Sequence, residues 1–224
     1  MKHTSLLYSM LATALLATPC VHAEDKVPLQ TELPKPLFVG TPVPIKIPNL
    51  EAPRSSKRPD FMVPPGLTNV AKGKTVTSSD NEPTIGDLTL ITDGVKDGDE
   101  GNYVELGKGK QYVQIDLGKA ADIYAVLIWH YHSQARVYRD VVVQVSDDPD
   151  FIDKVTTVFN NVYDAGTGMG VGIGKDPSYI ETYEGRLIDA KGVKGRYVRL
   201  YSRGNTANEA NHYIEVEVWG KPSA

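Results

Sequence analysis

Hydrophobic and polar residues alternate along the C-terminal stretch 213–219 in the manner of a β-strand. Every second position is apolar, so that the stretch interleaves Ile214, Val216 and Val218 with Glu215, Glu217 and Trp219. A period of two predicts a strand with one buried and one solvated face. Residues 123–129 (IYAVLIW) are instead apolar throughout, which predicts a central strand covered on both faces.

Short β-branched or aromatic runs separated by Gly, Asp and Asn continue this pattern from residue 68 onward. Such runs are typical of an antiparallel all-β domain. We expect strands at 112–117, 123–131, 140–146, 197–201 and 213–219. The sequence therefore predicts an all-β fold in which residues 67–220 form one β-sandwich, followed by a short tail at 221–224.

The first 23 residues have the three parts of a secretory signal: Lys2, an apolar stretch at 6–17, and small residues before a cleavage point after Ala23. We expect a secreted or periplasmic protein. The apolar stretch is shorter than the roughly 20 residues that span a bilayer, and no later segment is longer. The only cysteine, Cys20, falls in this signal; a lipid anchor there is the weaker alternative because Pro19 precedes it.

A proline-rich segment at 24–66 joins the signal to the domain and contains ten of the fifteen prolines. Prolines at this density oppose regular helices and ladders, so the first interpretation is an extended linker that acts as a spacer. The second interpretation is a strap lying along the sandwich, because residues 37–39, Ile45, Ile47 and Phe61 are apolar.

Charge excludes one class of partner. The whole chain has a formal charge of −4, and residues 67–224 contain 17 basic and 23 acidic side chains, counted from the sequence. Nucleic-acid binding relies on an excess of Lys and Arg facing phosphates, so this balance argues against a nucleic-acid partner.

Residues 129–139 (WHYHSQARVYR) carry the most informative side chains. If the strand continues, His130 and His132 point to one face, and the loop after them presents Arg136, Tyr138 and Arg139. Imidazole and guanidinium groups donate hydrogen bonds to hydroxyls, while an aromatic ring covers the apolar side of a pyranose. A polar loop before the last strand adds further candidates, and the predicted ligand-binding set is His130, His132, Arg136, Tyr138, Arg139, Asn208, Asn211 and His212.

Two other interpretations of the histidines stay open. In the first, they bond to the backbone, Trp129 belongs to the core, and the arginines form surface ion pairs. In the second, His130, His132 and His212 form a transition-metal site, because positions i and i+2 of a strand converge on one ion. The glycine-rich residues 166–174 are not a phosphate loop, since Asp176 follows Lys175 where Ser or Thr would be needed.

Five ordered segments resemble the discoidin family, also called coagulation factor 5/8 type C, which overlaps carbohydrate-binding modules with a galactose-binding-like jelly roll. They cover the last two thirds of the chain and read NVAKGK (69–74), YVQIDLG (112–118), VQVSDD (143–148), GRYVRLY (195–201) and EVEVWG (215–220). The resemblance implies a sandwich with its ligand loops at one end, a structural calcium and no catalysis. The basic spacing expected of the family's fucose-binding branch is absent, which leaves the sugar open.

The resemblance also points to the calcium ligands. The loop at 92–99 and Glu215 match the family's acidic positions, and Asp93, Asp97 and Glu215 are the predicted metal-binding residues. Carboxylates and turn carbonyls are the oxygen ligands that this ion requires. An Asp-Gly turn without metal is the alternative.

These observations lead to an expected function of non-catalytic recognition of a glycan or polysaccharide. The alternatives are a structural or adhesive domain that binds another protein, and an enzyme that uses a metal held by the three histidines. No carboxylate pair, nucleophile elbow or metalloprotease motif favours catalysis.

Overall fold

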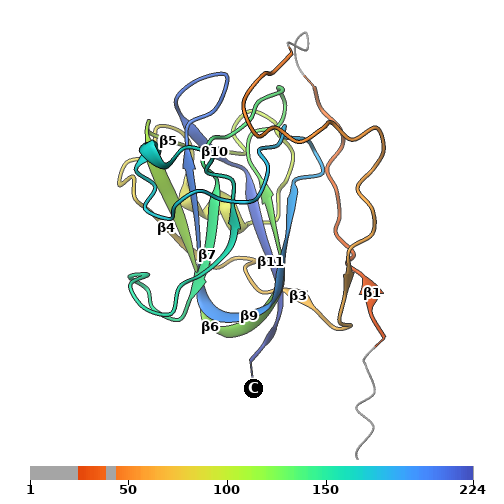
Figure 1. The fold of residues 1–224 in the computed structure, drawn as a ribbon. Helices are drawn as coiled ribbons and strands as arrows, with labels where there is room; N and C mark the ends of the chain where they lie inside the picture. Colours follow the sequence, from red (N-terminus) through yellow and green to blue (C-terminus); the bar gives the residue numbers. More distant parts are fainter. Residues whose placement is uncertain (1–24, 39–43, 224) are drawn as a thin grey trace, which may run out of the picture.

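The computed structural model describes residues 25–38 and 44–223, and nearly all of the regular structure within them is β-strand. Figure 1 shows the arrangement. The elements in chain order are β1 (Val27–Pro28), β2 (Met62–Val63), β3 (Thr68–Asn69), β4 (Thr75–Ser78), the 3₁₀ turn η1 (Leu88–Thr92), β5 (Val104–Leu106), β6 (Lys110–Trp129), β7 (Val142–Ser146), β8 (Thr156–Asn160), the 3₁₀ turn η2 (Ala165–Thr167), β9 (Arg186–Arg203), β10 (Asn211–Tyr213) and β11 (Glu215–Pro222).

Two long strands, β6 and β9, run through both layers of a sandwich. They pair antiparallel, and their register shifts between Asp116 and Ala121 and again between Ile123 and Ala125. Irregularities of this kind let a strand bend and change layer. One layer therefore contains β4, the first part of β6, the second part of β9, β7 and β8, and the other contains β3, β11 and the remaining parts of β6 and β9. The antiparallel β-sandwich expected from the discoidin resemblance is confirmed.

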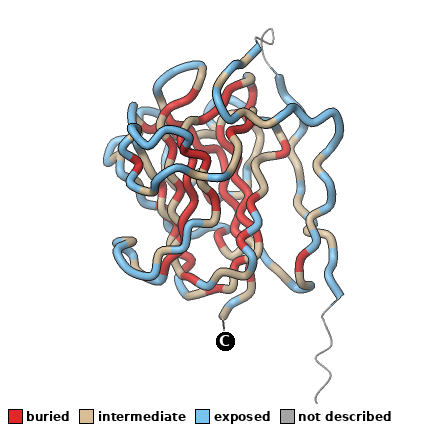
Figure 2. Tube along the Cα trace, in the orientation of Figure 1, coloured by how far each residue is buried: buried red, intermediate tan, exposed pale blue. Residues whose placement is uncertain are grey.

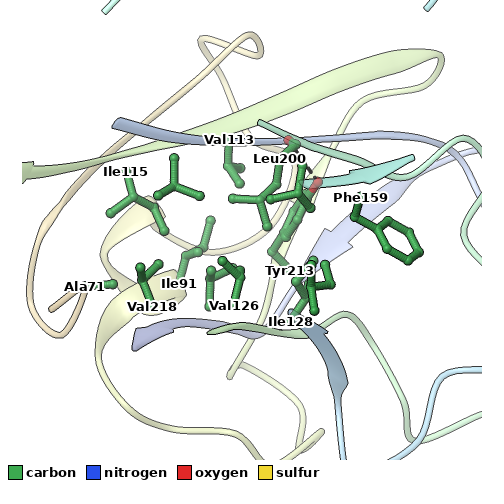
Figure 3. Packing of buried hydrophobic residues seen from close by; sticks show 14 of the residues in the cluster. Ala71, Ile91, Val113, Ile115, Val126, Ile128, Phe159, Leu200, Tyr213 and Val218 are labelled. Atoms are coloured by element: carbon green, nitrogen blue, oxygen red, sulfur yellow. Dashed lines mark hydrogen bonds between the residues drawn. The ribbon is translucent and has the colours of Figure 1, made fainter. Parts of the chain in front are cut away.

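The main core lies between the two layers (Figure 3). Val113 and Ile115 enter it from the first half of β6, while Val126 and Ile128 enter it from the second half. All four side chains are completely buried. Side chains alternate between the two faces of a strand, so every second residue in each half of β6 points into the core between the layers.

The opposite face of β6 is covered as well, as the apolar run at 123–129 predicts. Ala125, Leu127 and Trp129 form a second buried cluster. The indole of Trp129 is fully buried and donates from Nε1 to the carbonyl of Tyr183, 2.9 Å away. Gly185 closes over this ring at φ +64°, and a Cβ there would approach the indole to 2.6 Å, so only glycine fits.

The cover over this second cluster comes from the proline-rich segment, whose described residues 25–38 and 44–66 are called the strap below. Its Leu29, Leu33 and Phe61 pack against the cluster. Figure 1 shows the strap in orange along one side of the sandwich, and Figure 2 shows its mostly exposed and partly buried backbone beside the buried interior. The described part of the segment therefore lies along the sandwich, and the choice between linker and strap stays a prediction.

Ion pairs hold the strap in place. The Glu184 carboxylate accepts from Arg54 Nη2 at 2.8 Å, and Arg58 Nη1 donates to the carbonyls of Glu184 and Gly185. A further pair joins Arg186 to Glu51 at 2.9 Å. Because these anchors are partly shielded from water, they fix the position of the strap along β9 more firmly than exposed pairs would.

The prediction that one face of the last strand is solvated is wrong. Glu215 and Glu217 are 0% and 4% exposed, because the loop at 93–98 lies over them. Gly94 donates its backbone N–H to Glu215, and Lys96 pairs with Glu217. Ile214 also leaves the pattern: it packs in the second cluster, since the chain passes from β10 to β11 at this residue.

The predicted signal peptide and the alternative lipid anchor at Cys20 cannot be compared with the structure. The signal peptide at 1–23, with Cys20, lies outside the described residues, and its cleavage stays a prediction. In the described part of the chain, no helix is long and apolar enough to cross a membrane.

Candidate functional site

The predicted ligand-binding residues gather at the end of the sandwich opposite the C-terminus, where β5 and β10 lie in Figure 1. β6 ends at Trp129, so the next residues form a loop rather than a longer strand. This loop is fixed by an isolated bridge between Tyr138 and Asn205, and the short β5–β10 ladder places His212 opposite Glu105. Segments that are 67 and 107 residues apart in sequence thus meet at one end.

His130 lies in the buried floor of this end and is 0% exposed. Its Nδ1 is 2.8 Å from Glu181 Oε1, and its ring stacks on Tyr138 with the centroids 4.3 Å apart. Tyr213 covers it from another side, at 4.8 Å. A ligand at the surface therefore does not reach His130 in this conformation, and its partners give it a structural role.

Tyr138, His212 and Glu105 form a hydrogen-bonded chain. The Tyr138 hydroxyl lies 2.9 Å from His212 Nδ1, and His212 Nε2 lies 2.9 Å from Glu105 Oε2. Burial, together with the smaller effects of the nearby charges of Arg136 and His130, lowers the pKa of His212 to about 4. At neutral pH the imidazole is uncharged, so Nε2–H donates to the carboxylate and Nδ1 accepts from the hydroxyl.

Above this floor lies a group of aromatic and polar side chains that we call the rim. It consists of Tyr103, Tyr131, Gln134 and Arg136. The Arg136 guanidinium lies 4.4 Å from the centroid of the Tyr131 ring, and Tyr103 meets Tyr131 edge-on at 5.1 Å. Arg136 Nη2 donates to Gln134 Oε1 at 2.9 Å, while Arg136 Nε is buried without a partner in the described structure. Both tyrosines are partly exposed and Gln134 is exposed.

The asparagines of the 204–212 segment differ in role. Asn211 is completely buried and uses its whole side chain: Oδ1 accepts from Ser202 Oγ and Gly204 N, and Nδ2 donates to the carbonyls of Gly107 and Gly109. The ligand-binding prediction for Asn211 is corrected, because no donor or acceptor remains free.

Two predicted residues remain near the surface. Asn208 is exposed, and its Oδ1 accepts from Asn205 Nδ2 and Ala210 N, so that it orders its own turn. Arg139 is partly exposed, and its backbone pairs with Gly204 and Arg203. The contacts of these two residues do not test whether they bind a ligand, so their ligand roles stay predictions.

The transition-metal interpretation loses its geometric basis. Because the strand ends before His130, the two histidines do not share a face: His130 contacts Glu181, whereas His132 Nε2 contacts the Lys96 carbonyl at 2.9 Å. In the described residues, no group of three or more His, Cys, Asp and Glu side chains is placed to hold a metal ion.

The predicted calcium residues are only partly together. Glu215 Oε2 accepts from Gly94 N at 3.0 Å, while Oε1 is buried without a partner. Burial raises the pKa of Glu215 to about 8, with smaller contributions from the charges of Glu217 and Asp93. Asp93 is exposed at the end of η1. Asp97 instead accepts a hydrogen bond from Asn102 Nδ2 at 2.5 Å.

The glycine-rich loop is tightly curled rather than open. Gly168, Gly170 and Gly172 all have positive φ angles, between 71° and 82°. Met169 turns inward between them and packs on Val142. A loop with this backbone needs glycine at alternate positions, which explains the sequence pattern without a nucleotide.

The chain matches no protein-family model and no curated protein. Among solved structures, it is similar to a family 89 glycoside hydrolase from Clostridium perfringens in complex with 2-acetamido-1,2-dideoxynojirmycin, at 18% identity and a TM-score of 0.50. That similarity covers 69% of this chain and 15% of the hydrolase, so the chain corresponds to a small part of that enzyme.

Two smaller proteins also match. One is a fucose-binding module from Streptococcus pneumoniae, with 21% identity, a TM-score of 0.46 and coverage of 68% of this chain and 97% of the module. The other is a fucolectin from striped bass, Morone saxatilis, with 18% identity, a TM-score of 0.48 and coverage of 70% and 50%. At 18% identity, the similarity to the hydrolase shows a shared β-sandwich fold and no more.

Sequence reasoning singled out the segment 129–139, which contains Tyr131, but missed the neighbours of this segment. Glu105 lies in β5 and Tyr103 directly precedes it, and a strand of three residues gives no periodic signal. Glu181 lies in an irregular segment between β8 and β9. Only long-range pairing brings these residues to the histidines, and no local pattern could have found them.

Proposed function

We propose that this protein is a non-catalytic carbohydrate-binding module that recognises a glycan or polysaccharide at the rim. The observation that carries the proposal is the Arg136–Tyr131–Tyr103 arrangement, in which two rings and a guanidinium with an unused Nε–H meet at the loop end of the sandwich. Sugar recognition uses this combination, since rings cover the C–H face and charged donors bond hydroxyls.

The depth of each polar group decides its role in this proposal. His130, Tyr138 and His212 support the rim from below through their mutual contacts. Tyr131, which is partly exposed, and Gln134, which is exposed, are the groups that meet the sugar, while the buried Arg136 lies against the Tyr131 ring. Preformed support of this kind lowers the entropy cost of binding, because the contacting side chains are already ordered.

Replacing Tyr131 with alanine is expected to weaken glycan binding at least tenfold, which corresponds to about 1.4 kcal/mol. The reason is the loss of the ring that also positions Arg136. Binding is measured by calorimetry with the best ligand from a glycan array. The matched control is Tyr163→Ala, which removes an exposed tyrosine between β8 and η2 that is not part of the rim, and its affinity should stay within twofold of the unchanged protein.

Thermal unfolding of both variants separates a binding loss from a folding loss. If Tyr131→Ala binds the glycan as tightly as the unchanged protein, the rim is not the site. If an array of diverse polysaccharides shows no binding and a purified protein partner is captured instead, the chain is an adhesive or structural domain.

We also propose a structural calcium ion held by Glu215 and Asp93, in line with the family resemblance. Glu215 fits this role because its buried Oε1 has no partner in the described structure, and a cation would supply one. An ion that binds only the native state raises its stability. Millimolar calcium is therefore expected to raise the melting temperature of protein first treated with chelator by several degrees, and Glu215→Gln should abolish the rise. An equal melting temperature in calcium and in chelator would contradict the proposal.

A further inference from the structure

The strap and the sandwich border an open pocket of about 470 Å³ on the side of the molecule, which we call the seam pocket. Gln30 and Glu32 border it from the strap, while Lys72 and Trp219 border it from the sandwich. Its volume is within the range of small-molecule sites in proteins. Because neither the strap nor the sandwich forms it alone, the pocket depends on the strap being in place.

The floor of the seam pocket is a shielded ion pair. Lys96 Nζ lies 2.6 Å from Glu217 Oε1, and the two side chains are 10% and 5% exposed. The same ammonium donates to the carbonyl of Glu32 at 2.9 Å and lies 5.3 Å from the ring centroid of Trp129. These contacts fix the loop at 93–98 to both the strap and the sandwich.

The wall of the pocket is an oriented indole. Trp219 Nε1 donates to Glu217 Oε2 at 2.8 Å, which ties its ring to the same ion pair. Trp219 is only partly buried, although it packs on the second cluster. A large ring held in one orientation at the border of a cavity is suited to cover the apolar face of a ligand.

The polar groups around this wall are both donors and acceptors. Lys72 and the Glu32 carboxylate have no side-chain partner in the described part of the chain, and Asn69 Nδ2 is free because only its Oδ1 is used. The charges also balance, since two ammonium groups oppose two carboxylates around the cavity. A hydroxyl group both donates and accepts, so a neutral, hydroxyl-rich ligand fits this set better than an anion.

We propose that the seam pocket is a second binding site, for one unit of a neutral saccharide stacked on Trp219. The ligand class rests on the proposed carbohydrate-binding function. The loop at 92–99 connects the two sites, because His132 Nε2 contacts the Lys96 carbonyl and Ser133 Oγ donates to the Gly98 carbonyl at 2.6 Å. A module whose two sites are connected by one loop binds a polymer more tightly than it binds a single sugar unit.

The experiment titrates the full mature chain with neutral hexose and N-acetylhexosamine tetrasaccharides while recording tryptophan fluorescence. Trp129 is buried and bonded, so a saccharide-dependent change in emission is expected from Trp219. Lys72→Glu should weaken the saccharide affinity at the seam at least fivefold. The matched control Lys175→Glu changes an exposed lysine of the glycine-rich loop by the same charge and should leave the affinity within twofold.

Trp219→Phe provides the second readout, because it keeps an aromatic ring for folding but removes the reporter. The emission change should vanish in this variant while its melting temperature stays near that of the unchanged protein. If saccharide binds but Lys72→Glu has no effect and Tyr131→Ala abolishes binding, the seam proposal is overturned and the rim function stands. If Lys72→Glu weakens binding and Tyr131→Ala does not, the seam is supported and the rim fails. No saccharide binding at all would overturn both.

Discussion

Replacing Asn211 with alanine is expected to destabilise the protein by about 4 kcal/mol, since each buried polar group left without a partner costs roughly 1–3 kcal/mol. The change leaves the Gly204 N–H without its acceptor and the Ser202 hydroxyl with only the longer contact to Tyr213, and both residues are buried. It also releases the carbonyls of Gly107 and Gly109, which are nearer the surface. Because these four groups join the loops at the end of the sandwich, the rim should loosen with the loss of stability.

Chemical denaturation with a linear extrapolation measures this loss. Asn81→Ala is the matched control, since Asn81 is exposed and makes no side-chain hydrogen bond in the described structure. Its unfolding free energy should change by less than about 0.5 kcal/mol, as is usual for surface substitutions. A change below 1 kcal/mol for Asn211→Ala would contradict the structural role assigned here.

Acidification is expected to destabilise the protein through His212 by about 3 kcal/mol, because each pKa unit corresponds to 1.36 kcal/mol. The pKa of His212 is about 4 in the folded protein and 6.5 ordinarily. Between these values the unfolded chain binds the proton more strongly. The contribution of His212 is therefore fully present above pH 6.5 and is lost progressively as the pH falls toward 4.

Denaturation of the unchanged protein and of His212→Gln at pH 7, 5.5 and 4 tests this expectation. Glutamine can bond both Tyr138 and Glu105 without titrating, so the difference between the two proteins isolates the imidazole. Glu215 acts with the opposite sign, since its raised pKa of about 8 gives stability at low pH that is lost as the pH rises, but it is common to both proteins. Equal slopes for the two proteins would show that His212 does not titrate as described.

The fold was predictable because its strands carry local signals. Residues 123–129 are apolar on both faces, and both faces are buried, one in the main core and one in the second cluster. What covers the second face was not predictable, since the apolar residues of the strap have no periodicity. Prolines there exclude long ladders but not packing, and β1 pairs with β2 for only two residues.

Burial explains why the site was predicted only in part. The structure brings His130 and Arg136 to the loop end of the sandwich, but sequence spacing does not reveal how deeply a side chain is buried. The partners that bury His130 are Glu181 and Tyr213, which lie more than 50 residues away in the chain. A histidine next to a strand end has the same sequence pattern whether it faces solvent or a distant carboxylate. Only the tertiary contacts distinguish the two cases.

The central claim is that a glycan binds at the rim, and nuclear magnetic resonance tests it most directly. The side-chain Nε–H signal of Arg136 is observed while the best array glycan is added to the unchanged protein. The Arg136 guanidinium lies against the Tyr131 ring, so a sugar stacked on that ring should shift the signal in a saturable way. A glycan that binds while the Arg136 signal and the amides of residues 131–136 stay unmoved would contradict the account.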